Sequence, residues 1–155
     1  TLDHGDQPVL WRGRTMLRAD ARHAPVRFAK GALGNTEAFE VSPQHRMHIA
    51  GWQAELHFGL PEVFVSAAHL TGLSGVTRVV PRRVTYLHLL LPRHEIIRTA
   101  GTWSESYFTG ACLDRHADEI RRALPDRFAA LEEGLRGAQL ARPHVTGREA
   151  RTLAA

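Results

Sequence analysis

The sequence predicts a mostly β fold of short strands and hairpins, with C-terminal helices packed on it. Over the first hundred residues, short runs of β-branched and aromatic residues alternate with glycine and proline, a spacing typical of sandwiches and irregular barrels. After Phe108 the apolar residues recur at helical spacing instead. With 155 residues, of which 43% are hydrophobic, the chain is long enough for one hydrophobic core.

Eight candidate strands follow one another in the first part of the chain. Most of them are rich in β-branched or aromatic side chains, which fit the pleated surface of a sheet. They are residues 9–11, 26–28, 39–41, 46–49, 55–58, 63–65, 76–80 and 84–91.

Two hairpins are predicted among these strands. Residues 46–49 alternate polar and apolar side chains, and the segment 50–52, which contains Gly51, can turn the chain into the run 54–58. The second hairpin joins residues 85–91 to residues 94–99 across Pro92, because proline cannot continue a central ladder. This arrangement would place His94 just after a tight turn.

Three helices are expected toward the C-terminus. Apolar residues at helical spacing predict the first over 113–124, and Pro125 restarts a second that carries Phe128, Leu131 and Leu135. A last short helix is expected at Thr146, because Thr146 and Glu149 have capping-box spacing. We therefore expect residues 1–110 to form a β domain and residues 111–155 a helical extension of the same domain.

Composition excludes several classes of protein. The basic residues are arginines apart from Lys30, and they are scattered, so no specific nucleic-acid surface is predicted. No run approaches the roughly 20 apolar residues of a membrane helix. Cys112, the single cysteine, excludes an internal disulfide and a cysteine-rich zinc site, and a small buried thiol is expected there. The sequence makes no prediction of cellular location or oligomeric state.

Ten histidines are the most unusual feature, because imidazole can act as acid, base or metal ligand near neutral pH. Two are expected to be hydrogen-bonded structural residues, His57 and His69. His45 and His48 form a His-x-x-His pair, which admits either a structural or acid–base role or a metal site. Four others are interpreted as surface residues without partners: His4, His23, His116 and His144. The metal alternative needs a third ligand, and the candidates are His88, His94 and Glu95.

Two segments in order are more specific. The first is Val41-Ser42-Pro43-Gln44-His45-Arg46, and the second is the strand beginning at Val84 that contains Tyr86 and continues through His94. Together they resemble the two later sequence blocks of Hint (Hedgehog/intein) domains. Stretches at residues 7–13, 25–34 and 51–56 are similar to a bacterial Hint subfamily. The resemblance covers about residues 1–110 and implies a Hint-like, mostly β fold.

The family resemblance also implies a chemistry. In Hint domains a cysteine at the start of the domain attacks the peptide bond before it, which exchanges an amide for a thioester by an N-to-S acyl shift. By resemblance His45 is the general acid for the departing nitrogen. Ser42 stands where the family has threonine, and its hydroxyl would help hold the strained bond or the oxyanion. His94 is the later-block histidine. The resemblance implies no cofactor and no metal.

The chain departs from the family pattern in three places. Where many members have Asp or Cys after the tyrosine, this chain has Leu87 and then His88, which is either a substitute for that group or a structural partner in the strand. The His-Asn end of inteins is replaced by residues 101–106, so a cleavage-type relative is predicted rather than a splicing one. No cysteine precedes Cys112.

The last departure decides what is expected of this chain. We expect no turnover by the chain alone, and autoprocessing in a parent protein, with the missing N-terminal segment or the host polypeptide as partner. Two alternatives stay open, a degenerate Hint fold that serves as a binding or structural module, and a metal-dependent hydrolase built on the histidine cluster.

Overall fold

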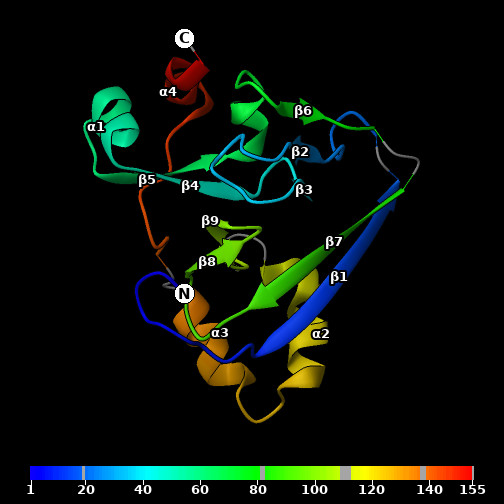
Figure 1. The fold of residues 1–155 in the computed structure, drawn as a ribbon. Coiled ribbons are helices and arrows are strands. Elements are labelled where there is room, and N and C mark those ends of the chain that lie inside the picture. Colours follow the sequence, from blue (N-terminus) through cyan, green and yellow to red (C-terminus); the bar gives the residue numbers. More distant parts are fainter. Residues whose placement is uncertain (19, 81–82, 109–112, 137–138, 155) are drawn as a thin grey trace.

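The computed structural model describes residues 1–18, 20–80, 83–108, 113–136 and 139–154, and within them the strands form three antiparallel sheets (Figure 1). A two-stranded ribbon pairs β1 (Trp11–Arg18) with β7 (Arg83–Leu90). A three-stranded sheet has the order β3 (Phe39–Val41), β2 (Val26–Phe28), β6 (Val76–Arg78). A four-stranded sheet has the order β5 (Glu62–Ser66), β4 (Arg46–Ala50), β9 (Thr102–Glu105), β8 (Ile96–Thr99).

The helices confirm the predicted change of period after the strands. They are α1 (Trp52–Phe58), the 3-10 helix η1 (Ala67–Leu70), α2 (Leu113–Ala123), α3 (Phe128–Arg136), α4 (Gly147–Ala150) and the 3-10 helix η3 (Arg151–Ala154). The capping box at Thr146 is present, because its side chain accepts the Glu149 N–H while the Glu149 carboxylate accepts the Thr146 N–H. The prediction of a mostly β chain with C-terminal helices is confirmed. The Cys112 prediction lies outside the described residues.

The first predicted hairpin is wrong. The run 54–58 is helical and belongs to α1, and β4 pairs with β5 instead. Gly51, with φ of 75°, ends the strand, and Gly59, with φ of 66°, provides a left-handed C-cap. Between them lie glutamine, alanine, glutamate and leucine, which favour a helix over a strand. The two glycines therefore bound one short helix rather than a turn and a strand.

The second predicted hairpin is also wrong. Strand β7 pairs along its whole length with β1, and β8 pairs with β9. The turn between β8 and β9 contains Ala100, with φ of 50°, and Gly101, with φ of 85°. Two consecutive residues of positive φ are what a two-residue hairpin turn requires, because its twist then matches that of the strands. Strand β1 begins at Trp11, where the sequence predicted a strand to end.

Buried apolar side chains form two clusters. The larger one joins the four-stranded and three-stranded sheets and includes Val145 and Ala150 from the C-terminal part. The smaller one lies where α2 and α3 cover the ribbon, and it consists of Trp11, Leu90, Ile120 and Phe128. The C-terminal residues therefore complete both clusters. No helix among the described residues is both long enough and apolar enough to cross a membrane.

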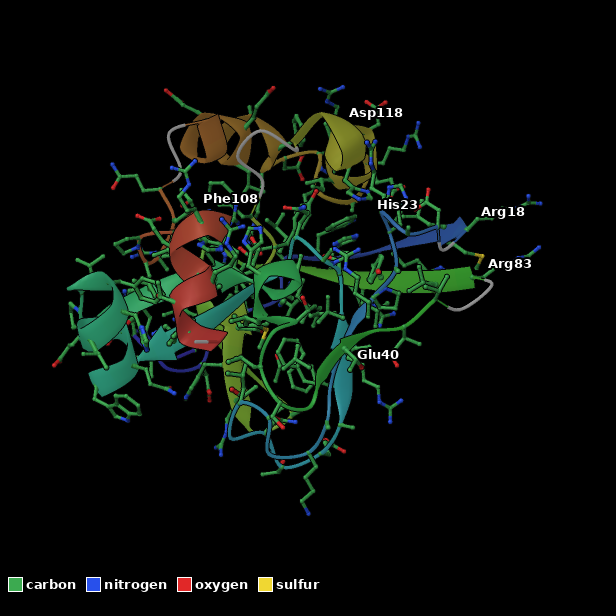
Figure 2. The ribbon with its side chains drawn as sticks, turned by 90° about the horizontal axis from the view of Figure 1, so that it is seen from above. Arg18, His23, Glu40, Arg83, Phe108 and Asp118 are labelled. Carbon is green, nitrogen blue, oxygen red and sulfur yellow. The ribbon has the colours of Figure 1, made fainter. Side chains whose placement is uncertain are left out.

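The ribbon extends away from these clusters at its far end, where Arg18 lies opposite Arg83 (Figure 2). At its near end Trp11 folds back over Gly13, two residues later on the same face of β1. A Cβ atom at Gly13 would lie 1.9 Å from Cη2 of the Trp11 ring. Glycine is therefore required at this position by the indole above it.

Candidate functional site

His45 lies in a tight turn directly before β4. Its N–H donates to the Ser42 carbonyl at 3.0 Å, and its own carbonyl accepts the Ala67 N–H at 2.8 Å. The carbonyl of the buried Pro43 accepts the Ala68 N–H, so the turn is held against the start of η1 on both sides. The backbone of His45 is therefore fixed, while no hydrogen bond to its ring is formed within the part of the chain that the structure describes.

The carboxylate of Glu105, at the end of β9, connects the groups around His45. One oxygen accepts the backbone N–H of Arg46 at 2.8 Å, and the other accepts Nη1 of Arg46 at 2.7 Å and Nε2 of His94 at 3.2 Å. The Glu105 side chain is 7% exposed. Charge-assisted hydrogen bonds offset its burial and hold the pKa of Glu105 below its usual value. Glu105 therefore remains a carboxylate.

His94 is the second predicted site residue that lies here. It precedes β8, its side chain is 1% exposed, and its ring meets Phe64 at 5.5 Å and Phe108 at 5.0 Å between centroids, both edge to face. The Arg46 guanidinium covers the same Phe108 ring at 5.5 Å. On the other side of the imidazole, Nδ1 accepts the backbone N–H of Ala141 at 3.0 Å. Both ring nitrogens of His94 therefore have partners.

That last contact comes from residues 139–146, which we call the C-terminal strap. In Figure 1 it runs upward from α3, passes the end of β5 and leads into α4. It pairs with β5, because the Phe64 N–H donates to the Pro143 carbonyl at 2.7 Å and the Val145 N–H donates to the Phe64 carbonyl at 3.0 Å. His144 within it has Nε2 3.1 Å from Oγ of Ser66. The strap therefore lies against the site.

Burial and the neighbouring charges favour the neutral form of the His45 imidazole. Burial lowers the pKa of His45, the Glu105 charge raises it, and the Arg46 and His94 charges lower it, with a net lowering. Burial and the Arg46 cation likewise lower the pKa of His144. A neutral imidazole without a partner on its ring can accept a proton and pass it on.

Two other predicted site residues lie differently. His88 is on β7 in a second histidine cluster, where Nε2 of His88 and Nε2 of His116 lie 3.1 and 3.2 Å from Oγ1 of Thr15. The two imidazole rings are 5.0 Å apart, and Tyr107 packs against both. Ser42 begins the His45 turn through its backbone carbonyl. Glu105 therefore binds His94 and Arg46, the neighbour of His45, whereas the His88 side chain lies among other partners.

The interpretation of four histidines as surface residues without partners is wrong about the partners and about the surface position of His116, whereas His4 and His144 are exposed as expected. His4 pairs with Glu95 at 2.9 Å, His23 with Asp20 at 2.8 Å, and His144 with Ser66. His116 is buried, with 6% of its surface exposed, because α2 covers the ribbon. The partners of His4, His116 and His144 are far away in sequence and therefore invisible in it, whereas Asp20 lies only three positions before His23.

His57 and His69 were expected to be hydrogen-bonded. Within the described residues neither ring has a hydrogen-bond partner; His57 lies half-buried on α1, and His69 is exposed beside Gly147.

A metal site on His45 and His48 finds no support in the geometry. The His48 side chain points away from Glu105, and its Nε2 pairs with the Glu62 carboxylate at 3.0 Å. His48 lines an open cavity of about 710 Å³, whereas His45 and His94 do not line it. Among the described residues, the one set of three ligand atoms close enough for an ion is Asp3, His4 and Glu95, and Asp3 there is already paired with Arg142. His94 and Glu95 face opposite sides of an extended chain, toward Glu105 and His4.

Sequence reasoning missed Glu105 and His144. One feature of the sequence pointed to Glu105. It is a charged residue eleven positions after His94, at the end of the short strand β9. Recognition of the Ala100-Gly101 turn would have placed β9 beside β8 and hence Glu105 beside His94. His144 gave no signal, because an extended segment after two helices has no period that indicates its neighbours.

Comparison with known proteins identifies the region that contains His45, His94 and Glu105. A family model described as Hint domain, Hint_2, matches residues 1–111. No curated protein and no solved structure matches the chain. The match ends before α2, so the strap lies outside it.

Proposed function

The chain belongs to the Hint domain family, and on this premise we propose that it is the histidine-bearing part of an autoprocessing site that cleaves its parent polypeptide by an N-to-S acyl shift. The observation that supports the proposal most directly is the convergence of Arg46 and His94 on the buried carboxylate of Glu105. His45 directly precedes Arg46, and the Glu105 charge acts on its ring, so the two histidines, 49 residues apart in sequence, lie around one carboxylate. Nothing in the packing of the core alone requires this.

The proposed step assigns His45 a proton relay. A cysteine thiol, placed upstream of Thr1 in the parent, gives its proton to neutral His45, and the thiolate attacks the carbonyl carbon of the preceding peptide bond. The protonated imidazole then gives the proton to the nitrogen of that bond as the C–N bond breaks. A thioester and an α-amine result, and His45 is neutral again. The lowered pKa of His45 suits the first half of this relay, because the imidazole is ready to accept a proton.

His94, Glu105 and Ser42 act around that relay in the proposal. The Glu105 carboxylate fixes the Arg46 N–H next to His45 and stabilises the imidazolium that forms on His45. His94, which Glu105 holds in place, is assigned to the later step in which the thioester is resolved. The Ser42 hydroxyl is assigned to the oxyanion by family resemblance. His88 is assigned a structural role, because Thr15 and Tyr107 engage its ring.

The experiment is expression of the full parent reading frame, followed by intact mass spectrometry with and without hydroxylamine or thiol. We expect cleavage in the wild type and none in His45→Ala. His23→Ala is the matched control, because the His23 side chain pairs with Asp20 on the surface, and it should cleave normally. A parent that stays intact under both nucleophiles refutes the proposal and favours the binding or structural module. Cleavage that a chelator abolishes would favour the metal-dependent hydrolase.

A further inference from the structure

We propose that the C-terminal strap is a working part of this site, which orients His94 through the Ala141 N–H and contributes His144 as a third histidine. The inference rests on the proposed function for what the site does, but its structural half can be tested without any cleavage. The strap lies beyond the region that the family model matches. The role is therefore assigned from the contacts of this chain alone.

The strap is anchored between Ala141 and His144 and again after His144. Arg142 binds the Asp3 carboxylate through Nη2 at 2.7 Å and also binds Glu62 through Nε. Downstream, Val145 is buried in the main core, and the capping box at Thr146 begins α4. Pairing with the outer edge of β5 supplies two more hydrogen bonds. These anchors fix the backbone that faces His94.

The Ala141 N–H selects one tautomer of His94. A backbone N–H can only donate, so Nδ1 of His94 must present its lone pair at 3.0 Å. The neutral ring then has its proton on Nε2, where it donates to Glu105 at 3.2 Å. The acceptor-only Glu105 carboxylate favours the same tautomer, so the strap and Glu105 together hold both ring nitrogens. Without the strap, Nδ1 would lose its donor, and Glu105 would hold the ring at Nε2 alone.

The effect of this orientation extends to His45. Glu105 accepts from His94 and from the Arg46 backbone, and Arg46 directly follows His45. If the His94 ring turned its Nε2 lone pair toward Glu105, that lone pair would repel the carboxylate oxygen that also binds Arg46 Nη1. His94 and Ala141 are therefore positioning residues for the acid–base group, in the sense that they act through Glu105.

His144 adds a third imidazole to the same surroundings. Arg46 pairs in register with Ser66, and the Ser66 hydroxyl binds His144. The charges of Arg46 and Glu105 both act on His144, so the ring lies within electrostatic reach of the central carboxylate. His144 is exposed, and the buried Ser66 hydroxyl holds its ring at one nitrogen.

The first test is structural and uses the 155-residue chain with ¹⁵N-labelled histidine. Two-dimensional NMR that correlates ring nitrogens with ring protons reports the tautomer of each histidine. We expect His94 as the Nε2–H form in the wild type and in Ala141→Gly, which keeps the N–H. In Ala141→Pro, which lacks the N–H, we expect the ¹⁵N signal of His94 Nδ1 to move to that of a nitrogen that accepts no hydrogen bond. An unmoved Nδ1 signal in a folded Ala141→Pro variant would overturn the positioning role.

A second variant covers the case in which Ala141→Pro does not fold. Arg142→Ala removes the ion pairs to Asp3 and Glu62 and keeps the strap's backbone donors, so the strap should detach more often. Faster amide exchange at Phe64 and Val145 should then accompany a shifted His94 Nδ1 signal. Faster exchange with an unmoved Nδ1 signal would overturn the positioning role.

The second test measures cleavage of the parent polypeptide. We expect Ala141→Pro and His144→Ala each to slow cleavage about tenfold or more, since a misoriented histidine costs up to about 10⁴-fold in a known catalytic triad. His23→Ala, at a side chain that pairs with Asp20 on the surface, should cleave at the wild-type rate. Normal cleavage by His144→Ala would remove His144 from the site. A wild-type parent that does not cleave refutes the proposed function, while the NMR result at His94 Nδ1 still decides the structural half.

Discussion

Replacement of Glu105 by glutamine is the most informative single perturbation of this molecule. Glutamine has the same shape, but it has no charge, and one carboxylate oxygen becomes an NH₂ donor. Three hydrogen bonds end on the carboxylate, two from Arg46 and one from His94. At least one of them must be lost, and the Arg46 cation loses its counterion.

The expected cost follows from the exposure of the pair. A broken buried ion pair costs about 3–5 kcal/mol, whereas a surface pair contributes about 0–1 kcal/mol. The Glu105 side chain is 7% exposed and that of Arg46 is 22% exposed, so solvent partly screens the remaining guanidinium. We therefore expect Glu105→Gln to lower the free energy of unfolding by about 2–3 kcal/mol. For a chain of this size the melting temperature should fall by roughly 5–10 °C.

The assay is urea denaturation followed by tryptophan fluorescence, with calorimetry for the melting temperature. Glu40→Gln is the matched control, because Glu40 pairs with Arg27 at 3.5 Å and both side chains are exposed. Its free energy of unfolding should fall by no more than about 0.5 kcal/mol. An NMR titration supplies an independent readout. The Glu105 charge raises the pKa of His45, so its removal should lower that pKa further. A stability loss below about 1 kcal/mol together with an unmoved His45 pKa would refute a central role for the carboxylate.

Three further predictions follow from the same structure. The pKa of His45 in the folded state lies below its unfolded value, so the unfolded chain binds more protons and unfolding becomes easier as pH falls below about 6.5, by at most about 1.4 kcal/mol per pH unit for this histidine. Denaturation at several pH values should show this slope, and an equal slope in His45→Gln would contradict the assignment. Gly13→Ala should cost about 2–4 kcal/mol because its Cβ would overlap the Trp11 ring, whereas Gly134→Ala, in open space on α3, should gain about 0.5–1 kcal/mol. The reverse order in thermal melts would refute the contact. Thr146→Ala should cost about 1 kcal/mol through loss of the helix cap, and an unchanged melting temperature would argue against the capping box.

Local rules predicted well the elements whose causes are local. The short strand at 26–28 was predicted with its bounds, and the capping box at Thr146 was predicted from two residues. The helices α2 and α3 followed from apolar spacing, since one face of each must be buried. Family order predicted His45 and His94 for one site, and the structure places His94 and Arg46, the neighbour of His45, on one carboxylate, although neither hairpin around them was predicted correctly.

What the sequence by itself determined is therefore the fold class and the family, because periodicity, caps and motif order are written along the chain, and the two site histidines are its prediction. Only the tertiary structure decided which strands pair, that Glu105 joins His94 to Arg46, the neighbour of His45, and that the strap brings Ala141 to His94 and His144 to Ser66. The physical reason is that each of these contacts joins residues far apart in sequence. A carboxylate is buried where donors from several elements meet, and no single segment carries the information about where the others will lie.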